Sequence, residues 1–249
     1  MTSPNINTVH AFTTRFGGVS TGIYESLNLA QKAGDDINVK ENYARLCKAL
    51  DISTDSLVCS TQVHGTTIRL ASNDDCGNLL KPNPHKADAL ITQTPNVALM
   101  VFTADCVPIL LFDPVRKVAG AVHAGWRGTA ADIAGIAVLK MRESFGSYPA
   151  DIKAAIGPCI SKCCFETDED VPAALLKTLS DNADSCYKKT GNKYMVDLKE
   201  ANRILLTKAG VTDIVLSDEC TCCSFDKYWS HRKTKGKRGT QAAIIMLNQ

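Results

Sequence analysis

Three apolar segments follow one another closely near the middle of the chain, and they constrain the fold more than any other feature of the sequence. The segments are VALMVFT (97–103), VPILLF (107–112) and KVAGAVH (117–123). Short apolar runs that are rich in branched side chains and separated by turn residues are typical of buried β-strands. The sequence therefore predicts three closely spaced, buried strands.

Helical patterns alternate irregularly with strand patterns along the rest of the chain. The predicted helices cover 38–50, Thr129 to about Ser144, and Asp197 to Gly210. In the first of these, Val39, Tyr43 and Leu46 recur at helical spacing. In the last, Asp197 with Glu200 forms a capping-box pattern, and the glycine closes the helix. Further strands are predicted at AAIG (154–157), VTDIVLS (211–217) and AAIIML (242–247).

This order of elements favours an α/β or α+β fold, a single domain with mixed β-sheets flanked by helices. Strand clusters joined by long crossover helices are typical of that class. The sequence contains no repeat and no low-complexity tract, and its polar, turn-rich segment at 73–84 is too short to separate two domains. Residues 1–249 are therefore predicted to form one domain.

The composition limits the class of partner. The chain has 249 residues, of which 45% are hydrophobic and 22% charged, and its net charge is +2. So small a charge argues against nucleic acid or an anionic membrane as the main partner and favours a small, neutral or anionic substrate. No segment has the length and apolarity of a membrane span or a signal peptide. Together with the odd count of eleven cysteines, this predicts reduced thiols in the cytoplasm.

His64 (in TQVHG), Cys106 (in TADC) and His123 (in VHAGWRG) each lie beside a predicted strand end. Strand ends bring together residues that are distant in the sequence. Two imidazoles and one thiolate form a good zinc set, and three protein ligands leave a position open for water or substrate. Simple packing is the competing explanation, because buried cysteines and strand histidines are common without a metal.

Polar residues near these positions are candidates for substrate binding. Asp105 is predicted to orient a ligand, to act as a general base, or only to cap the strand end. Arg127 stands between two glycines before a predicted helix, where an anion or only solvent is expected. Two loops are further candidates for substrate binding. The first begins at Arg15 with the sequence RFGG and continues through Ser20 and Gly22, and the second is HRKTKGKRG (231–239). Gly-rich turns and charged loops of this kind are mostly only turns or solvated segments.

Several motifs in a fixed order give the chain a resemblance to the YfiH family, also called the multicopper polyphenol oxidoreductase (laccase) family and related to human FAMIN. The motifs are RFGGVSTGIYESLNL (15–29), QVHG (62–65), ADALIT (87–92), ADCVPILL (104–111), VHAGWRGTA (122–130), IGPCI (156–160), DLKEANR (197–203) and SHRKTKGKRG at the C-terminal end. The resemblance spans almost the whole chain.

The resemblance implies an α/β fold of mixed sheets with zinc bound by His64, Cys106 and His123. It also implies a purine nucleoside enzyme that phosphorolyses adenosine, inosine, guanosine and methylthioadenosine and deaminates adenosine. Cys106, His123 and Asp105 are then the expected catalytic residues. Phosphate is expected at Arg15, Arg127 and Arg232. The proton shuttle that zinc deaminases use is unassigned, with Asp105 and Glu166 as candidates.

Two features of the chain are not accounted for by the resemblance. The C-terminal segment reads KYWSHRKTKG in place of the family's aromatic and double-arginine run, which leaves roles for His231 and Arg232 open. The further thiols at 159, 163, 164, 220, 222 and 223 match no standard zinc ribbon, which favours structural or incidental cysteines over a second metal site.

Two other activities are compatible with the same residues. A Cys with two His is also a copper ligand set, which allows polyphenol oxidation. Five histidines in the chain are too few for a full multicopper centre. Alternatively, Cys106 is a nucleophile and His123 its base in a hydrolase that edits peptidoglycan precursors. A metal-binding or interaction module without turnover is the non-enzymatic alternative.

Overall fold

The computed structural model describes residues 1–30, 35–77 and 84–248. Within these ranges the α-helices are α1 (Asp36–Leu50), α2 (Trp126–Ala130), α3 (Ile133–Phe145), α4 (Asp170–Leu179), α5 (Leu198–Lys208) and α6 (His231–Thr234). The strands are β1 (Val9–Phe12), β2 (Leu57–Val58), β3 (Ile68–Leu70), β4 (Ala89–Thr92), β5 (Ala98–Thr103), β6 (Val107–Asp113), β7 (Val118–Ala124), β8 (Lys153–Ile156), β9 (Glu166–Thr167), β10 (Tyr187–Thr190), β11 (Lys193–Val196), β12 (Asp213–Leu216) and β13 (Gln241–Met246).

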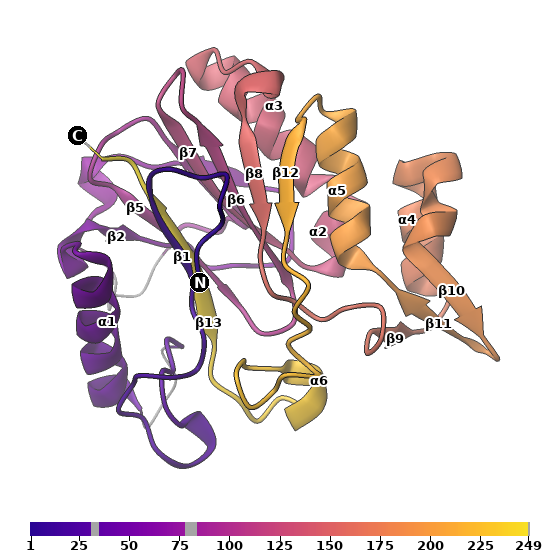
Figure 1. Cartoon of the computed structure of the whole chain (residues 1–249), viewed down its shortest axis with the longest axis horizontal. Coiled ribbons are helices and arrows are strands. Elements are labelled where there is room, and N and C mark those ends of the chain that lie inside the picture. Colours follow the sequence, from indigo (N-terminus) through magenta and orange to yellow (C-terminus); the bar gives the residue numbers. More distant parts are fainter. Residues whose placement is uncertain (31–34, 78–83, 249) are drawn as a thin grey trace.

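The strands form three sheets (Figure 1). A six-stranded sheet has the order β12-β8-β6-β7-β4-β3, a four-stranded sheet has the order β1-β13-β5-β2, and β10-β11-β9 form a small third sheet. The six-stranded sheet is mixed: β12 is parallel to β8 and β3 to β4, whereas β6, β7 and β4 pair antiparallel. The predicted fold of mixed sheets flanked by helices is confirmed.

The two larger sheets pack face to face, with α1 covering the outer face of one and α2, α3, α4 and α5 lying beyond the outer face of the other (Figure 1). Along β6, Ile109 and Leu111 join the helical side of the core, while Leu110 joins the core between the sheets. Along β5, Leu99 faces the inter-sheet core and Met100 packs on the α1 side. Burial on both faces explains why these strands are continuous apolar runs without a polar alternation.

The single helix predicted from Thr129 to about Ser144 is wrong in one respect, because the structure divides it into α2 and α3. Asp132 interrupts the segment with a left-handed backbone (φ 60°), and its carboxylate accepts a hydrogen bond from the Gly135 N–H at 2.9 Å. An Asp side chain that satisfies a free N–H begins a new helix. Consequently α2 has only five residues.

The other predicted elements are confirmed within a few residues of their expected bounds. Asp197 caps α5 by accepting from the Glu200 N–H at 3.1 Å, but the Glu200 carboxylate pairs with Arg203 and not with the cap backbone. The polar 73–84 segment begins with a short 3-10 helix, and its residues 78–83 lie outside the described part of the chain. In the described ranges, no helix combines the length and the apolar composition needed to cross a membrane.

Candidate active site

The structure brings His64, Cys106 and His123 together. His64 lies in the loop between β2 and β3, Cys106 in the turn between β5 and β6, and His123 near the end of β7. Because β6 and β7 are antiparallel with Pro108 opposite His123, the start of β6 lies beside the end of β7. One potential ligand atom from each side chain lies within 4.8 Å of the others, and Cys106 Sγ is 3.9 Å from His64 Nε2.

Asp88 holds two of these residues in place, a role that the sequence analysis missed. Its fully buried carboxylate lies 2.9 Å from His123 Nδ1, which leaves Nε2 of that ring for a ligand. The same carboxylate accepts hydrogen bonds from the backbone N–H groups of His64 and Gly65 at 2.9 and 2.8 Å. Carboxylates that orient a metal-binding imidazole in this way are common around zinc. The only signal in the sequence was an acid directly before a buried strand, in ADALIT.

The space around the three side chains fits a metal ion. Gly125 is the critical position, because a Cβ there would lie 2.7 Å from His64 Cδ2 and 3.5 Å from Cys106 Sγ. Any larger residue would push the histidine out of the group. His123 is buried, whereas His64 is exposed and Cys106 partly exposed, so the group opens to solvent on one side. Two imidazoles, one thiol and an open side match the donor set of a catalytic zinc site.

Charge also favours a thiolate at Cys106. Burial opposes its ionisation, but the neighbouring His123 and His64 outweigh burial and lower the pKa of the Cys106 thiol to about 6. Burial disfavours the charged form of His123 as well, yet Cys106 and Asp88 raise the pKa of this imidazole to about 9. A thiolate is the form of cysteine that binds metals and attacks electrophiles.

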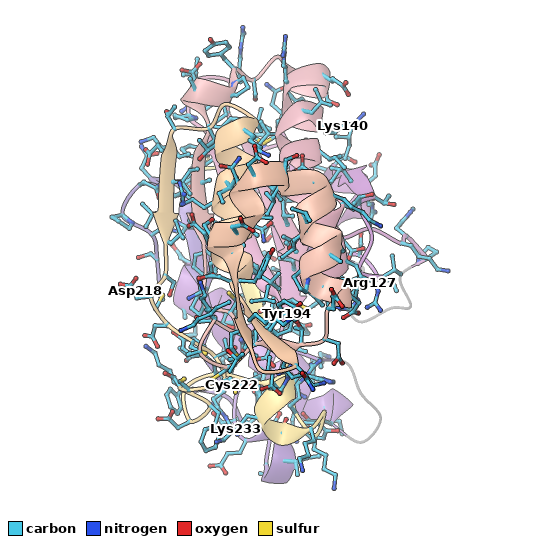
Figure 2. The ribbon with its side chains drawn as sticks, turned by 90° about the vertical axis from the view of Figure 1, so that its right-hand side faces the viewer. Arg127, Lys140, Tyr194, Asp218, Cys222 and Lys233 are labelled. Atoms are coloured by element: carbon cyan, nitrogen blue, oxygen red, sulfur yellow. The ribbon has the colours of Figure 1, made fainter. Side chains whose placement is uncertain are left out.

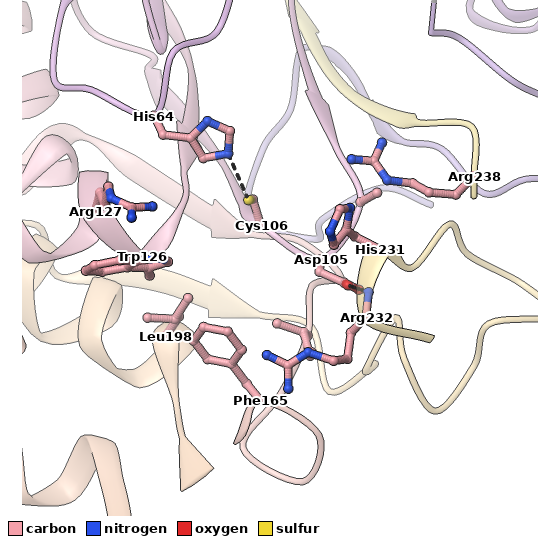
Figure 3. Close-up of a pocket in the computed structure, with 12 residues that line it drawn as sticks. His64, Asp105, Cys106, Trp126, Arg127, Phe165, Leu198, His231, Arg232 and Arg238 are labelled. Atoms are coloured by element: carbon pink, nitrogen blue, oxygen red, sulfur yellow. Dashed lines mark hydrogen bonds between the residues drawn. The ribbon is translucent and has the colours of Figure 1, made fainter. Parts of the chain in front are cut away.

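A cavity of about 350 Å³ opens from this group (Figure 3). Its lining residues are His64, Ala104, Asp105, Cys106, Trp126, Arg127, Ile160, Phe165, Leu198, His231, Arg232 and Arg238. Figure 3 shows Arg127 beside Trp126 at one end, and Arg232 and Arg238 at the other. The cavity therefore combines a candidate metal centre, three cations and two aromatic rings, and its volume is in the range of small-molecule sites.

Asp105 lies in the cavity wall, but its two oxygens already accept hydrogen bonds. Oδ1 accepts from the Thr221 hydroxyl and Oδ2 from the Arg232 N–H, both at 2.7 Å. The residue is buried and has a left-handed backbone (φ 88°). These contacts tie the β5–β6 turn to the C-terminal loops, which favours the orienting role over the general-base role.

The three predicted phosphate-binding arginines have different positions. Arg15 is not among the residues that line the cavity: its guanidinium stacks on Trp229 at 4.1 Å and donates to the Glu25 carbonyl at 2.8 Å. Arg127 lines the cavity, stacks on Trp126 at 4.2 Å and is exposed at the surface (Figure 2). Its short helix weakens the expected contribution of a helix dipole to anion binding.

Arg232 and Arg238 complete the cationic lining. The Arg232 guanidinium lies 5.4 Å from the Phe165 ring and donates to the Cys164 carbonyl at 3.2 Å. Arg238, which the sequence analysis included only within a charged loop, is partly buried, and its Nε has no hydrogen-bond partner among the described residues. Burial lowers the pKa of Arg238, against the opposing charges of Cys106 and Asp105. Nη1 of the same guanidinium donates to the Gly239 carbonyl at 3.1 Å. A guanidinium group in the wall of a cavity is suited to an anionic ligand.

Fold and site together define a mixed α/β protein with a candidate metal centre at the base of a cationic cavity. The family model described as multi-copper polyphenol oxidoreductase laccase matches residues 9–248, and the chain belongs to this family. The family expected from the sequence motifs is thus confirmed.

Relatives with known names cover nearly the same length. The purine nucleoside phosphorylase YlmD of Geobacillus stearothermophilus is 38% identical, over 97% of this chain and 91% of its own. A purine nucleoside phosphorylase of Deinococcus radiodurans is 39% identical, over 98% and 91%. The crystal structure of the Bacillus licheniformis hypothetical protein YfiH superposes with a TM-score of 0.92 at 34% identity, covering 96% of this chain and 92% of its own.

Proposed function

We propose that this chain is a cytoplasmic, single-domain, zinc-dependent purine nucleoside phosphorylase whose active site is the cavity beside His64, Cys106 and His123. The observation that carries the proposal is that one cavity joins this candidate metal-binding group to the guanidinium groups of Arg127, Arg232 and Arg238. The relatives in Geobacillus stearothermophilus and Deinococcus radiodurans are named purine nucleoside phosphorylases, which supports the same activity. The proposed substrates are adenosine, inosine, guanosine and S-methyl-5′-thioadenosine, each with inorganic phosphate.

In phosphorolysis, a phosphate oxygen forms a bond to C1′ of the ribose while the C1′–N9 bond breaks. The purine leaves with the bonding electron pair and takes up a proton, and the products are the base and ribose 1-phosphate (or methylthioribose 1-phosphate). Arg238 and Arg232 are proposed to hold the phosphate dianion, because guanidinium groups bind it with paired hydrogen bonds. The apolar faces of Trp126 and Phe165 are proposed to bind the flat base.

His64, Cys106 and His123 would hold the zinc, which would supply Lewis-acid polarisation of a bound oxygen and keep Cys106 as a thiolate. Asp88 fixes the His123 ring and the loop that carries His64. The Asp105 carboxylate positions Arg232 by accepting a hydrogen bond from the backbone N–H of that arginine. These contacts pre-organise the cavity before substrate binds.

Adenosine deamination is proposed as a slower second activity at the same site. Cys106 and His64 line the cavity and would hold the metal beside it, where it would supply an activated water for attack at C6 of a purine. Among the described residues of the lining, however, Asp105 is the only acid and both its oxygens are engaged, while Glu166 does not line the cavity. Zinc deaminases use a carboxylate to transfer protons. A site without a free one favours phosphorolysis.

A chromatographic assay of metal-quantified protein with adenosine tests this function. We expect adenine and ribose 1-phosphate only when phosphate is present, and inosine at a lower rate. Arg238→Gln should raise the KM for phosphate about 10- to 100-fold, because a hydrogen bond between charged groups contributes about 1.5–3 kcal/mol. Arg15→Gln should leave this KM unchanged, since Arg15 lies outside the cavity. The proposed phosphate site would be contradicted if both variants raised the KM for phosphate equally, or if Arg238→Gln left it unchanged.

Copper-dependent polyphenol oxidation is the alternative that the family description suggests. In the described part of the chain, His64, Cys106 and His123 form the only group containing histidine that could hold a metal. A blue-copper centre with a trinuclear cluster needs many more histidines. We expect copper-loaded protein to oxidise phenols only slowly, and oxidation at the rate of a dedicated oxidase would refute this.

A metal-free cysteine hydrolase, including one that edits peptidoglycan precursors, is tested by removing the metal. The phosphorylase proposal predicts that a strong chelator abolishes turnover and that added zinc restores it. Activity that survives chelation but disappears when Cys106 is alkylated would favour the hydrolase, because a metal-bound thiolate is a poor nucleophile.

A further inference from the structure

Four cysteines outside the proposed active site form a second compact group of thiols. They are Cys163, Cys164, Cys220 and Cys223, and their sulfur atoms all lie within 4.8 Å of one another. Cys223 Sγ is 3.5 Å from Cys163 Sγ and 3.4 Å from Cys164 Sγ. The structure thus brings together four of the thiols that the sequence spacing left without a role.

The fold creates this group by pairing two loops. One loop follows β8 and the other follows β12, and these two strands are parallel neighbours. The pairing continues beyond the strands as a bridge between Cys159 and Cys220. In the first loop a tight turn, with the Cys164 N–H donating to the Ser161 carbonyl at 2.9 Å, presents the adjacent Cys163 and Cys164. A parallel pair of strands therefore delivers two cysteines from each loop.

We propose that these four cysteines bind a structural Zn²⁺ ion. A tetrahedral site with Zn–S bonds of about 2.3 Å places its sulfur atoms about 3.8 Å apart, close to the 3.5 and 3.4 Å that separate Cys223 Sγ from Cys163 Sγ and Cys164 Sγ. Cys220 and Cys223 have the C-x₂-C spacing of zinc knuckles. The Ser161 N–H donates to Cys220 Sγ at 3.4 Å, a contact that stabilises a thiolate ligand. Four sulfur ligands close the coordination shell, which is typical of structural and not of catalytic zinc.

This ion would clamp one wall of the active-site cavity. Phe165, which follows Cys164 directly, lines the cavity, and the Cys164 carbonyl accepts from the Arg232 guanidinium at 3.2 Å. On the other loop, Thr221 follows Cys220 and donates to Asp105 at 2.7 Å. Figure 2 shows this region through Cys222, which lies in that view between Tyr194 of β11 and Lys233 of α6. The thiol group is partly exposed, so an ion can reach it.

The test counts zinc in the whole protein. Native mass spectrometry and elemental analysis of reduced, unsubstituted protein should find two zinc ions per chain. The single variant Cys106→Ala should retain one zinc ion, and so should the double variant Cys163→Ser/Cys223→Ser. The triple variant that combines all three substitutions should retain none. Cys222→Ser is the matched control, since this cysteine is in the same tract but outside the group of four, and it should retain two ions.

Cobalt gives a readout that is independent of stoichiometry. Cys106→Ala protein loaded with Co²⁺ should show the intense thiolate charge-transfer absorption and d–d bands of tetrahedral four-sulfur coordination, which the added Cys163→Ser/Cys223→Ser pair should abolish. The same pair should lower the Tm by about 5–10 °C through loss of the clamp. Cys106→Ala protein without bound metal would overturn the proposal. A disulfide between these cysteines in freshly isolated protein, detected as a mass lower by two hydrogens, would also overturn the proposal. The presence of iron in place of zinc would do the same.

Discussion

Cys106→Ala and His64→Ala are each expected to lose the active-site metal and to lower kcat/KM for adenosine phosphorolysis about 10³-fold. Lewis-acid stabilisation by a metal is worth several kcal/mol, and each 1.4 kcal/mol changes the rate about tenfold. Both side chains are at least partly exposed, so the fold should be largely retained. Elemental analysis, the chromatographic assay and thermal unfolding of the same samples measure the three effects.

A buried thiol remote from the cavity provides the control for these variants. Cys47 packs in α1 against the four-stranded sheet and is 2% exposed. Cys47→Ala should cost some stability, as a small cavity in a core does, while zinc content and kcat/KM stay unchanged. If Cys106→Ala or His64→Ala keeps its full zinc content, the assignment of the ligands is wrong.

Asp88→Asn is expected to weaken zinc binding about 10- to 100-fold and also to lower stability. The first effect follows because carboxylates behind a metal-binding imidazole typically contribute that much to metal affinity. The second follows because the buried carboxylate accepts from three backbone N–H groups as well as from His123, and an amide can accept only at one oxygen. Unsatisfied buried donors cost about 1–3 kcal/mol each. Competition with a chromophoric chelator and thermal unfolding measure the two losses.

Asp113→Asn separates the two effects. Asp113 is equally buried at the end of β6, where Oδ1 accepts from the N–H groups of Val115 and Arg116 at 2.8 and 2.9 Å. It has no contact with the candidate metal-binding group. The amide keeps an oxygen for both N–H groups, but these hydrogen bonds lose the charge of the carboxylate, so stability should fall while zinc affinity stays unchanged. Equal zinc affinities for Asp88→Asn and the unsubstituted protein would show that Asp88 supports only the fold.

The central strands were predictable because both of their faces are buried. Ile109 and Leu110 in β6, like Leu99 and Met100 in β5, contact opposite layers of the core, so nearly every position along these two strands is buried. The break between α2 and α3 was not predictable from apolar spacing. The break depends on Asp132, which adopts a left-handed backbone and caps α3. In the sequence, an Asp that caps a helix cannot be distinguished from an Asp on the exposed face of a continuous helix.

For the site, residue chemistry and family motifs identified the three potential metal ligands, and the structure places them together. Motif membership did not indicate where Arg15 would lie: its guanidinium stacks on Trp229, and it is not among the residues that line the cavity. Arg238 carries no distinguishing signal within a segment of many basic residues. Its burial and its free Nε became apparent only when the C-terminal loop was seen against the cavity.

The sequence by itself determined the class of fold, the family and the candidate metal ligands, because apolar periodicity and ligand chemistry are local properties of the chain. Only the tertiary structure decided which side chains meet. The parallel pairing of β8 with β12 gathers thiols from residues 163 and 223, and the antiparallel pairing of β6 with β7 joins Cys106 to His123. Such long-range pairing depends on strand order and register, which are set by packing of the whole core and not by any single segment.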